Sequence, residues 1–296
     1  MIQKINIYNI DVIIKGRYPR IARVMEEWDS DILNPEYMVE KIRDSNFGCD
    51  LFTFIQRIPE TVPKHNYYME WHNVAAIQIS SYDQWWAKQI TQEARNKVRK
   101  AIKKKVDIRV VNFNDEFVNG ISEIYNETLI RQGKPFPHYG KEFEILKKSH
   151  ATYLERSTFI GAYYEEEMIG FIKLVYAGHF IRTMEIISKI KHRDKAPTNG
   201  MIAKAVEICL ERKVPYLVYG QFDYGKTGNA SLMQFKKDLG FQQINLPRYF
   251  IPISIKGKMF IKLGIQNGIL EILPKFMYDK YLEKRKEWYL RKYVGK

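Results

Sequence analysis

Residues 158–188, TFIGAYYEEEMIGFIKLVYAGHFIRTMEIIS, decide the fold class of this chain. The stretch is rich in β-branched and aromatic residues, and we expect three strands in it, at 158–164, 168–176 and 180–188. The connections Glu165–Glu167 and Gly178–His179 are short enough for antiparallel hairpins. The sequence therefore predicts an antiparallel meander of three strands.

Helices and further strands are expected on both sides of this meander. Asn114 and either Thr198 or Asn199 are expected to cap helices, because these side chains accept hydrogen bonds from free N–H groups. The expected elements from residue 107 onward are a strand at 107–112, helices at 114–133 and 141–154, the meander, a helix from 198, a strand at 215–219, a helix from Asn229, and strands at 241–245 and 249–253. Their order is β-α-α-β-β-β-α-β-α-β-β.

The first 105 residues have a less regular pattern. We expect strands at 4–14, 50–58 and 67–79 and helices at 21–28, 35–42 and 82–105. The second half of the last helix carries seven Lys or Arg and no acid between Arg95 and Lys105. After residue 255, Pro274 is expected to divide a basic, aromatic-rich tail into two helices.

Composition narrows the class of protein without choosing a function. The hydrophobic share of 45% and the charged share of 28% are typical of a folded globular chain, and the net charge is +14. Such an excess favours anionic ligands such as phosphates, CoA, RNA or acidic lipid, although a solubilising surface explains it equally well. The cysteines Cys49 and Cys209 fit no disulfide framework, and we expect no metal site. With no signal peptide or membrane-spanning run recognised, we expect a cytoplasmic protein.

Three strings connect the chain to a known family. They are ARNKVRKAIKKKVDIRVV at 94–111, APTNGMIAKAVEICLERK at 196–213 and NASLMQFKKDLGF at 229–241. In this order and spacing they resemble the Fem-like branch of the GNAT superfamily. The resemblance implies an α/β GNAT fold with a mixed sheet. It also implies a smaller, truncated GNAT-like lobe at 1–84, a catalytic domain with a leading basic helix at 85–255, and a basic helical tail at 256–296.

The resemblance implies an acyltransferase. Fem-type ligases move amino acids from aminoacyl-tRNA onto peptidoglycan precursors, and relatives are acyl-CoA-dependent acetyltransferases. We expect transfer from acetyl-CoA or another acyl-CoA, by direct attack, to an amine on a small molecule, a peptide or a glycan precursor. One alternative is an aminoacyl-tRNA donor, with tRNA bound by the basic helix. Another is a non-catalytic protein that binds nucleic acid, or a membrane surface through the basic tail.

The donor site is expected at the turn before the helix at 198. Free N–H groups at a helix start favour an anion, and we assign donor phosphate binding to Lys195, Pro197, Thr198, Asn199 and Gly200. An ordinary capped helix explains the same residues. The usual Arg/Gln-x-x-Gly-x-Gly/Ala turn of acetyl-CoA-binding GNATs is absent, and Phe235 stands where many of them have a proton-donating Tyr. Further donor contacts are assigned to Ile186, Ile187, Tyr219 and Asn229.

Catalysis is expected where the strands 180–188 and 215–220 separate. By resemblance to GNAT enzymes, Glu185 is a candidate base, although it also fits a strand residue paired with Arg182 or Lys173. Asp223 and Tyr224 are further candidates for proton transfer. Lys236 is either a cation near the leaving group or a solvated helix lysine. The loop that holds Arg131, Gln132, Lys134 and His138 is expected to line the acceptor site, or to be a simple turn.

Overall fold

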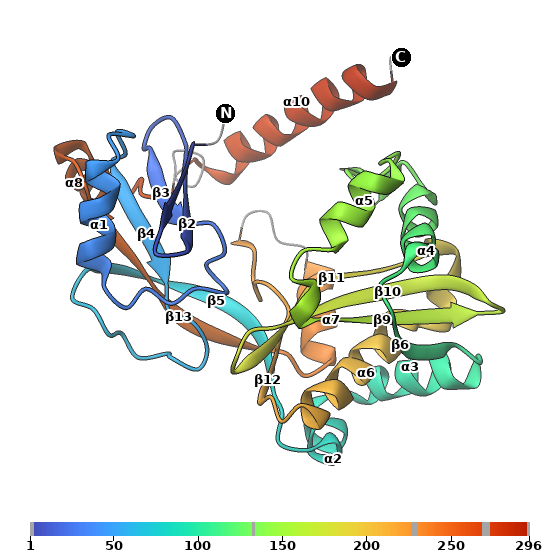
Figure 1. Cartoon of the computed structure of the whole chain (residues 1–296). Helices are drawn as coiled ribbons and strands as arrows, with labels where there is room; N and C mark the ends of the chain where they lie inside the picture. Colours follow the sequence, from blue (N-terminus) through green and yellow to red (C-terminus); the bar gives the residue numbers. More distant parts are fainter. Residues whose placement is uncertain (1–2, 132–133, 226–229, 268–272, 295–296) are drawn as a thin grey trace. The chain divides into compact units, whose positions relative to one another are not determined.

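Two units make up the chain, which a computed structural model describes at residues 3–131, 134–225, 230–267 and 273–294. Unit 1 comprises Met1–Asn73 and Asn245–Lys292, and unit 2 contains Val74–Ile244. Two long strands, β5 (Tyr68–Gln78) and β13 (Gln242–Pro252), carry the chain from one unit into the other (Figure 1). The expected domain boundaries at 84/85 and 255/256 follow the lobes that the family resemblance implies, whereas the two units follow contacts within the chain. The expected boundaries therefore stay predictions.

Unit 1 is built on a sheet in the order β1-β2-β3-β4-β13. Its first four strands are β1 (Gln3–Ile7), β2 (Ile10–Lys15), β3 (Ile21–Val24) and β4 (Leu51–Ile55). Helix α1 (Pro35–Asp44) buries Met38, Val39 and Ile42 in the same hydrophobic cluster as residues of these strands. The tail contributes α8 (Ile255–Lys262) and α10 (Lys275–Val294), and α10 begins directly after Pro274 as expected.

Two of the predicted elements in unit 1 are wrong. The expected strand at 4–14 is a hairpin of β1 and β2, because Tyr8 and Asn9 turn the chain with φ angles of 47° and 63°. The expected helix at 21–28 begins instead with strand β3, which pairs with β2 and, in parallel, with β4. The apolar residues of 21–28 fit a helical spacing, but Ala22 and Val24 are the buried ones, which is the alternation of a strand.

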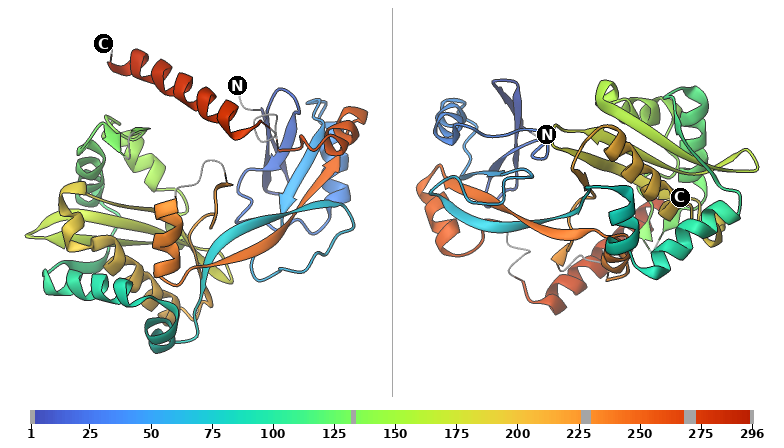
Figure 2. Two further views of the ribbon diagram at one scale, coloured as in Figure 1. Left: turned by 180° about the vertical axis from the view of Figure 1, so that it is seen from behind. Right: turned by 90° about the horizontal axis from the view of Figure 1, so that it is seen from below.

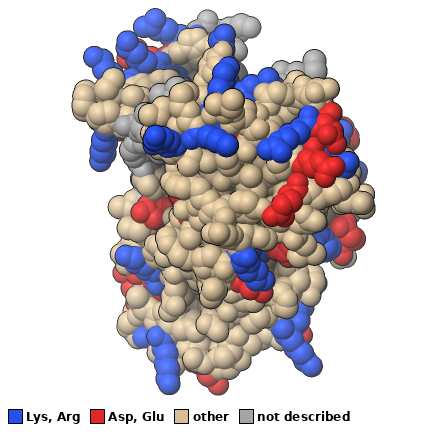
Figure 3. All heavy atoms as spheres, turned by 90° about the vertical axis from the view of Figure 1, so that its left-hand side faces the viewer, with Lys and Arg blue, Asp and Glu red and all other residues tan. Residues whose placement is uncertain are grey.

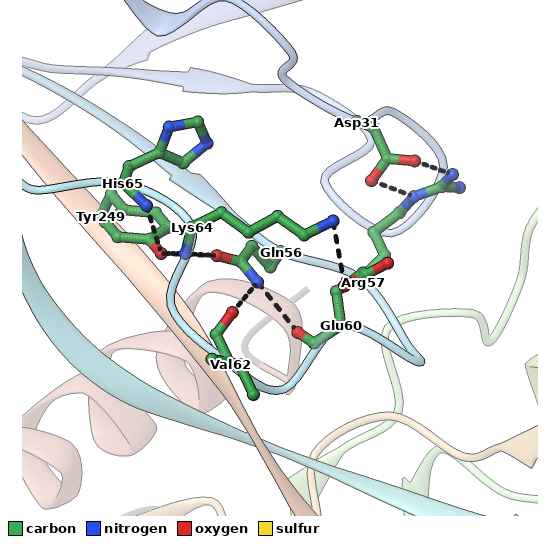
Figure 4. Close-up of polar contacts among 8 residues, drawn as sticks. All are labelled: Asp31, Gln56, Arg57, Glu60, Val62, Lys64, His65 and Tyr249. Atoms are coloured by element: carbon green, nitrogen blue, oxygen red, sulfur yellow. Dashed lines mark hydrogen bonds and ion pairs between the residues drawn. The ribbon is translucent and has the colours of Figure 1, made fainter.

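Hydrogen bonds to the buried side chains of Tyr249 and Gln56 hold the loop between β4 and β5. The hydroxyl of Tyr249 donates to Oε1 of Gln56 over 2.5 Å and accepts from the backbone N–H of Lys64 over 2.8 Å (Figure 4). The amide of Gln56 donates to the carbonyl oxygens of Glu60 and Val62. One tyrosine on β13 therefore fixes a loop about 185 positions earlier in the chain.

Unit 2 contains the expected meander in a mixed sheet. Its strand order is β5-β12-β11-β10-β9-β6. The strands not yet bounded are β6 (Asp107–Val111), β9 (Ser157–Tyr164), β10 (Glu167–Tyr176), β11 (Phe180–Ser188) and β12 (Tyr216–Val218). Strands β9, β10 and β11 pair antiparallel, whereas β11 and β12 are parallel. The prediction of a mixed α/β sheet is confirmed.

Helices cover both faces of this sheet. On one face α3 (Gln92–Lys103) and α6 (Pro197–Glu211) lie side by side and share a buried core (Figure 2). On the other face α4 (Asp115–Asn126) and α5 (Phe143–His150) share a second core with β9 and β10. The shorter elements are α7 (Ala230–Asp238), the two-residue strands β7 (Ile130–Arg131) and β8 (Lys134–Pro135), and the 3₁₀ turns Leu154–Arg156 and Ile190–Lys195.

The expected helix at 82–105 is interrupted. A short turn, α2 (Tyr82–Gln84), continues as the π-helix Trp85–Gln89, and the chain is extended at Ile90 before α3 starts. Thr91 caps α3, with its Oγ1 accepting the Ala94 N–H over 3.2 Å. Trp85 is fully buried and its indole N–H donates to the Leu239 carbonyl over 3.0 Å. This tertiary contact overrides the continuous helical pattern.

The two strands expected at 241–245 and 249–253 form a single strand, β13. Pro247 lies inside it, although proline usually interrupts a strand. Its carbonyl accepts the Gln56 N–H over 3.0 Å. Since proline lacks only the donor, the pairing that uses its acceptor is retained.

Candidate active site

Strands β11 and β12 separate after a short parallel contact. They pair over three residues, from Phe180 with Tyr216 to Arg182 with Val218. Beyond this point the chain after β12 follows β5 instead: the Tyr219 N–H donates to the Ala75 carbonyl over 2.8 Å, and the Ala75 N–H donates to Gly220 over 2.9 Å. Strand β11 meanwhile continues to Ser188 beside β10. The expected splay between the two strands is therefore present within unit 2.

Glu185 lies in the separated part of β11, in contact with both helices of the adjacent face. The Tyr125 hydroxyl, from α4, donates a short hydrogen bond to its carboxylate. His150 Nε2, at the end of α5, lies 3.2 Å from the Tyr125 hydroxyl oxygen and 3.9 Å from Glu185 Oε2. The alternative pairing with Lys173 is not formed, because that ammonium donates to His150 O over 2.8 Å and to Thr152.

We call Tyr125, His150, Lys173 and Glu185 the Glu185 cluster. Burial disfavours the charged form of each ionisable group in it. Burial raises the pKa of Glu185 above its usual range, and it raises that of Tyr125 as well. Burial, with the nearby charge of Lys173, lowers the pKa of His150 to about 4, and burial lowers that of Lys173 to about 8. At neutral pH the imidazole is therefore uncharged beside a carboxylate whose proton affinity is raised.

His138 and Lys141 extend this cluster. The His138 ring lies 4.8 Å from the Tyr125 ring, between centroids, and His138 Nδ1 lies 3.0 Å from Lys141 Nζ. Burial and the charge of Lys141 lower the pKa of His138. The placement of His138 next to Tyr125 brings one residue of the expected acceptor loop to the candidate base.

The other residues of that loop lie elsewhere. Arg131 is mostly buried and donates to the Ser188 carbonyl over 2.5 Å, so it contacts the end of β11. Its Nη1 is buried without a hydrogen-bond partner. Lys134 is exposed in β8, and Gln132 lies outside the described residues.

Helix α6 begins at Pro197 without a side-chain cap, so the expectation that Thr198 or Asn199 caps it is wrong. The Thr198 hydroxyl lies 3.1 Å from the Ser188 hydroxyl at the end of β11, and Asn199 is buried. Gly200 packs against β6, since a Cβ there would lie 2.2 Å from Ile108 Cδ1. Close packing therefore explains this glycine without a ligand. The first N–H groups of α6 keep no side-chain acceptor, which suits an anion.

The cations before α6 are largely paired. Glu167 binds Lys189 over 2.6 Å, Lys191 over 2.7 Å and His192 over 3.0 Å. We call these four residues, with Glu123 and Glu127, the Glu167 clamp. Glu123 also binds Lys189, and the Glu127 carboxylate accepts the backbone N–H groups of Ile190 and Lys191.

Ion pairing in the clamp favours the charged forms. Burial alone would raise the pKa of Glu167, but hydrogen bonds from Lys189, Lys191 and His192 lower it to about 2. Lys195, next along the chain, places its ammonium 4.4 Å from the Tyr164 ring centroid and 3.5 Å from Asp194. Less positive charge is thus left for a donor phosphate than the sequence alone indicates.

Lys236 is fully buried in α7, so the alternative of a solvated helix lysine is wrong. Its ammonium donates to the carbonyls of Tyr219 (2.9 Å) and Gln221 (2.5 Å), just beyond β12. It also lies 4.4 Å from the Tyr219 ring and 5.0 Å from the Tyr224 ring. Burial lowers its pKa to about 8. Lys236 therefore holds the segment after β12, at the point where this segment diverges from β11.

The remaining candidates have different surroundings. Ile186 packs in the core under α6 and Ile187 in the core under α4, so the two side chains point to opposite faces of β11. Asp223 accepts the Gly225 N–H over 2.8 Å, and Tyr224 is 38% exposed. Phe235 packs against the core under α6. Asn229 lies outside the described residues.

Sequence reasoning missed Tyr125 and His150, and it named Lys173 only as a possible pairing partner of Glu185. Tyr125 lies on the apolar face of its helix, among residues of the hydrophobic core. The available signal was Lys173, in the middle of the apolar run MIGFIKLVY, because a lysine buried in a strand needs polar partners. Within the described ranges, no group of three His, Cys, Asp or Glu is placed to hold a metal ion.

Comparisons with known proteins agree with this architecture. No family model and no curated protein matches the sequence. Among solved structures, FemX matches with a TM-score of 0.61 at 10% identity, over 88% of this chain and 90% of FemX. The fold is that of FemX.

Two further solved structures share this fold, and one of them is named for a lysylphosphatidylglycerol synthetase. The C-terminal domain of a protein described as such a synthetase from Agrobacterium fabrum matches with a TM-score of 0.57 at 11% identity, over 89% of this chain and 88% of that one. L-PGS from Bacillus licheniformis matches with 0.55 at 13%, over 88% of each chain. The predicted Fem-like GNAT fold is thus confirmed. In the described part, no helix has the length and apolar content needed to cross a membrane.

Proposed function

We propose that this protein transfers an acyl group from an acyl-CoA to an amine, by direct attack of the amine on the donor carbonyl. The observation that carries the proposal is the position of Glu185 in the separated half of β11, hydrogen-bonded to Tyr125. Its side chain is 26% exposed, so a substrate can reach it. The similarity of the fold to that of FemX supports the same assignment.

Glu185 acts as the general base in this proposal. An ammonium acceptor must lose a proton before its nitrogen can attack, and a base works best when its pKa lies near the working pH. Burial moves the pKa of Glu185 in that direction. The Tyr125 hydroxyl fixes the carboxylate through its hydrogen bond, and backbone N–H groups freed by the splay are suited to stabilise the oxyanion.

Lys236 stabilises the negative charge that develops on the leaving group. Its ammonium is buried at the end of β12, where a fixed positive charge is little screened by water. Phe235 has no proton to give, so the proton for the leaving thiolate comes from Tyr224 or from water. Tyr224 is suitable because its ring lies beside the Lys236 ammonium and is partly exposed.

Calorimetric titration with acetyl-CoA and longer acyl-CoAs tests the donor. We expect binding at or below millimolar concentration, and release of free CoA thiol when primary amines are added. Glu185→Gln should keep the binding and lose the release. Absence of binding by every acyl-CoA would exclude this donor.

An aminoacyl-tRNA donor is the second candidate. It is favoured by exposed cations on and after α3 (Lys100, Lys103, Lys104 and Lys105) and by the pairing of the cations before α6, which leaves less charge for CoA phosphates. Phosphate contacts predict binding of charged tRNA that falls steeply with salt. Changing Lys103, Lys104 and Lys105 to Glu should abolish this binding. The single change Lys103→Glu should weaken it more than its matched control Lys134→Glu on β8, which alters the net charge equally. Equal loss in the two single variants would point to net charge alone.

A further inference from the structure

A continuous set of contacts leads from Glu185 to a primary amine of the protein itself. The carboxylate of Glu185 accepts from Tyr125, the Tyr125 ring lies 4.8 Å from the His138 ring, and His138 Nδ1 lies 3.0 Å from Lys141 Nζ. Three elements supply these residues: β11, α4 and the loop before α5. The amine therefore lies on the same side of the sheet as the candidate base.

The imidazole next to Lys141 is neutral and has a ring nitrogen that can accept a hydrogen bond. Burial and the charge of Lys141 lower the pKa of His138, so the ring is neutral near pH 7. Since the ring nitrogen facing an ammonium must be the unprotonated one, Nδ1 accepts from Lys141. Burial raises the pKa of Glu185 and lowers that of His150; the positive charge of Lys141 opposes the first shift and adds to the second, so the ammonium is within electrostatic reach of both groups.

The other lysines of this face are differently engaged. Lys147 is bound to Asp115 over 2.7 Å, and Lys173 donates three hydrogen bonds to His150 and Thr152. Lys189 is held by Glu123 and Glu167. Lys148 is exposed on α5, seven positions after Lys141. Of these, Lys141 is a half-buried residue whose amine directly contacts a neutral imidazole.

We propose that Lys141 is an intramolecular acyl acceptor, so that the protein acylates its own Nζ atom at this position. The inference rests on the proposed function, because the donor is the acyl-CoA thioester bound at the splay between β11 and β12. The modified residue, Lys141, thus belongs to the group of residues connected to Glu185 and not to the residues assigned to donor binding.

The step balances with the groups present and the thioester. Lys141 first loses one ammonium proton to water, and His138 Nδ1 holds the neutral amine by accepting a hydrogen bond from it. The nitrogen attacks the thioester carbonyl, an N–C bond forms and the C–S bond breaks. His138 Nδ1 takes the second proton and passes it to Glu185 through Tyr125, and CoA leaves as the thiolate and is protonated by water. The product is a neutral amide at Lys141 and free CoA.

Site-resolved mass spectrometry of the full chain tests the proposal. The protein is incubated with acetyl-CoA carrying a ¹³C-labelled acetyl group, and acetyl occupancy is measured at each lysine against time. We expect Lys141 to be labelled at least about tenfold faster than Lys148, with a rate that saturates with acetyl-CoA concentration. Lys141→Arg should remove the fast phase, and Lys148→Arg should leave it unchanged.

Variants of the neighbouring groups separate enzymatic from spontaneous labelling. His138→Asn and Glu185→Gln should each slow labelling of Lys141 at least about tenfold while leaving Lys148 unchanged. The same chain in concentrated urea should show no preference among lysines, which also controls for a variant that fails to fold. If Lys141 is labelled as fast in Glu185→Gln as in the wild type, the reaction is spontaneous and the proposal is wrong.

The outcome distinguishes this inference from the proposed function. If acetyl-CoA binds and CoA is released to added amines, but Lys141 is labelled no faster than Lys148, the self-acylation is excluded and the transferase stands. If acetyl-CoA neither binds nor labels any lysine above the urea control, both the acyl-CoA donor and this inference are excluded.

Discussion

Unit 2 contains two clusters of ionisable side chains whose protein environments act in opposite directions. In the Glu185 cluster burial dominates: the pKa of Glu185 is raised, and those of His150 and Lys173 are lowered to about 4 and about 8. In the Glu167 clamp ion pairing dominates: the pKa of Glu167 is lowered to about 2 and that of Lys189 is raised. The first environment favours neutral groups that can exchange protons. The second favours fixed charges that hold a loop.

The comparison separates reactivity from stability. Both clusters contact β11 or its end, and both contain glutamate and lysine, so composition does not distinguish them. What differs is the number of partners: Glu167 is bound by two lysines and a histidine, whereas the Glu185 carboxylate accepts one hydrogen bond from a neutral hydroxyl. This difference in pairing predicts that Glu185→Gln will reduce activity, whereas Glu167→Gln will reduce stability.

The largest effect is expected from Glu185→Gln. Loss of a positioned general base should reduce kcat/KM for acyl transfer by about 10²–10⁴-fold. Removal of a buried charge with a raised pKa should leave the free energy of unfolding unchanged or higher at pH 7. The measurements are thiol release and urea unfolding, and a variant that keeps wild-type turnover would remove Glu185 from the mechanism.

Glu167→Gln should act on stability instead. It leaves the buried ammonium of Lys189 with the exposed partner Glu123, and loss of such a pair costs about 2–4 kcal/mol in the free energy of unfolding. Glu123→Gln is the matched control, because Glu123 is 63% exposed and its loss should cost less than about 1 kcal/mol. Equal effects of the two changes in urea unfolding would show that the clamp is not specific to Glu167.

Low pH should abolish the difference between wild type and Glu167→Gln. The pKa of Glu167 is about 2 in the folded chain against an ordinary value of 4.5, so its stabilisation is present above pH 4.5. It is lost as the pH falls from 4.5 towards 2. Urea unfolding of both proteins at pH 7, 4 and 3 should show the gap shrinking. A gap that stays constant would mean that the charge of Glu167 does not matter.

Tyr125→Phe should have the smallest effect. It removes the hydroxyl that fixes the Glu185 carboxylate and keeps the ring packing, so we expect about a 5–10-fold loss of kcat, corresponding to about 1 kcal/mol for one hydrogen bond. Because that bond lowers the pKa of Glu185, the acidic limb of the pH–rate profile should move to higher pH in the variant. A loss of kcat with an unchanged profile would indicate a purely structural role.

The meander and most helices were predictable because local pattern and tertiary structure agree. Residues 158–188 alternate and turn where the sheet requires it, and Asn114 caps α4 with a 2.9 Å hydrogen bond as expected. The prediction of a helix at 21–28 was wrong because the apolar spacing there fits a helix, while pairing with residues of β4 about 30 positions later makes part of the segment a strand. The break at Ile90 depends on Trp85 reaching Leu239, a contact that no local window contains.

The candidate site was predictable only in part. Glu185 and Lys236 came from resemblance to a family, and both lie where the strands separate. Tyr125 and His150 were not found, since an aromatic or histidine side chain on an apolar helix face is indistinguishable from core until its partner is known. The pairing of Lys189, Lys191 and His192 with one glutamate is equally invisible in sequence, because Glu167 lies about 22–25 positions earlier.

The charge on one face of unit 1 does not favour one candidate partner over another. The face of unit 1 drawn in Figure 3 carries scattered lysine and arginine side chains together with a group of acidic ones. A net charge of +14 is therefore not gathered into one basic patch on this face. The direct test of nucleic-acid binding is to measure the salt dependence of tRNA binding by the wild type and the loss of that binding in the Lys103–Lys105 variant.

The route of the chain through β5 and β13 has a consequence for its synthesis. Strand β4, LFTFI, is buried at every position and needs β3 on one edge and residues 248–252 of β13 on the other. As the polypeptide emerges from the ribosome, unit 2 can be completed before that second partner has been translated. An apolar strand with an open edge is prone to aggregate. Nascent chains halted between residues 73 and 245 should therefore bind chaperones that recognise Leu51–Ile55, and release them once β13 has been made.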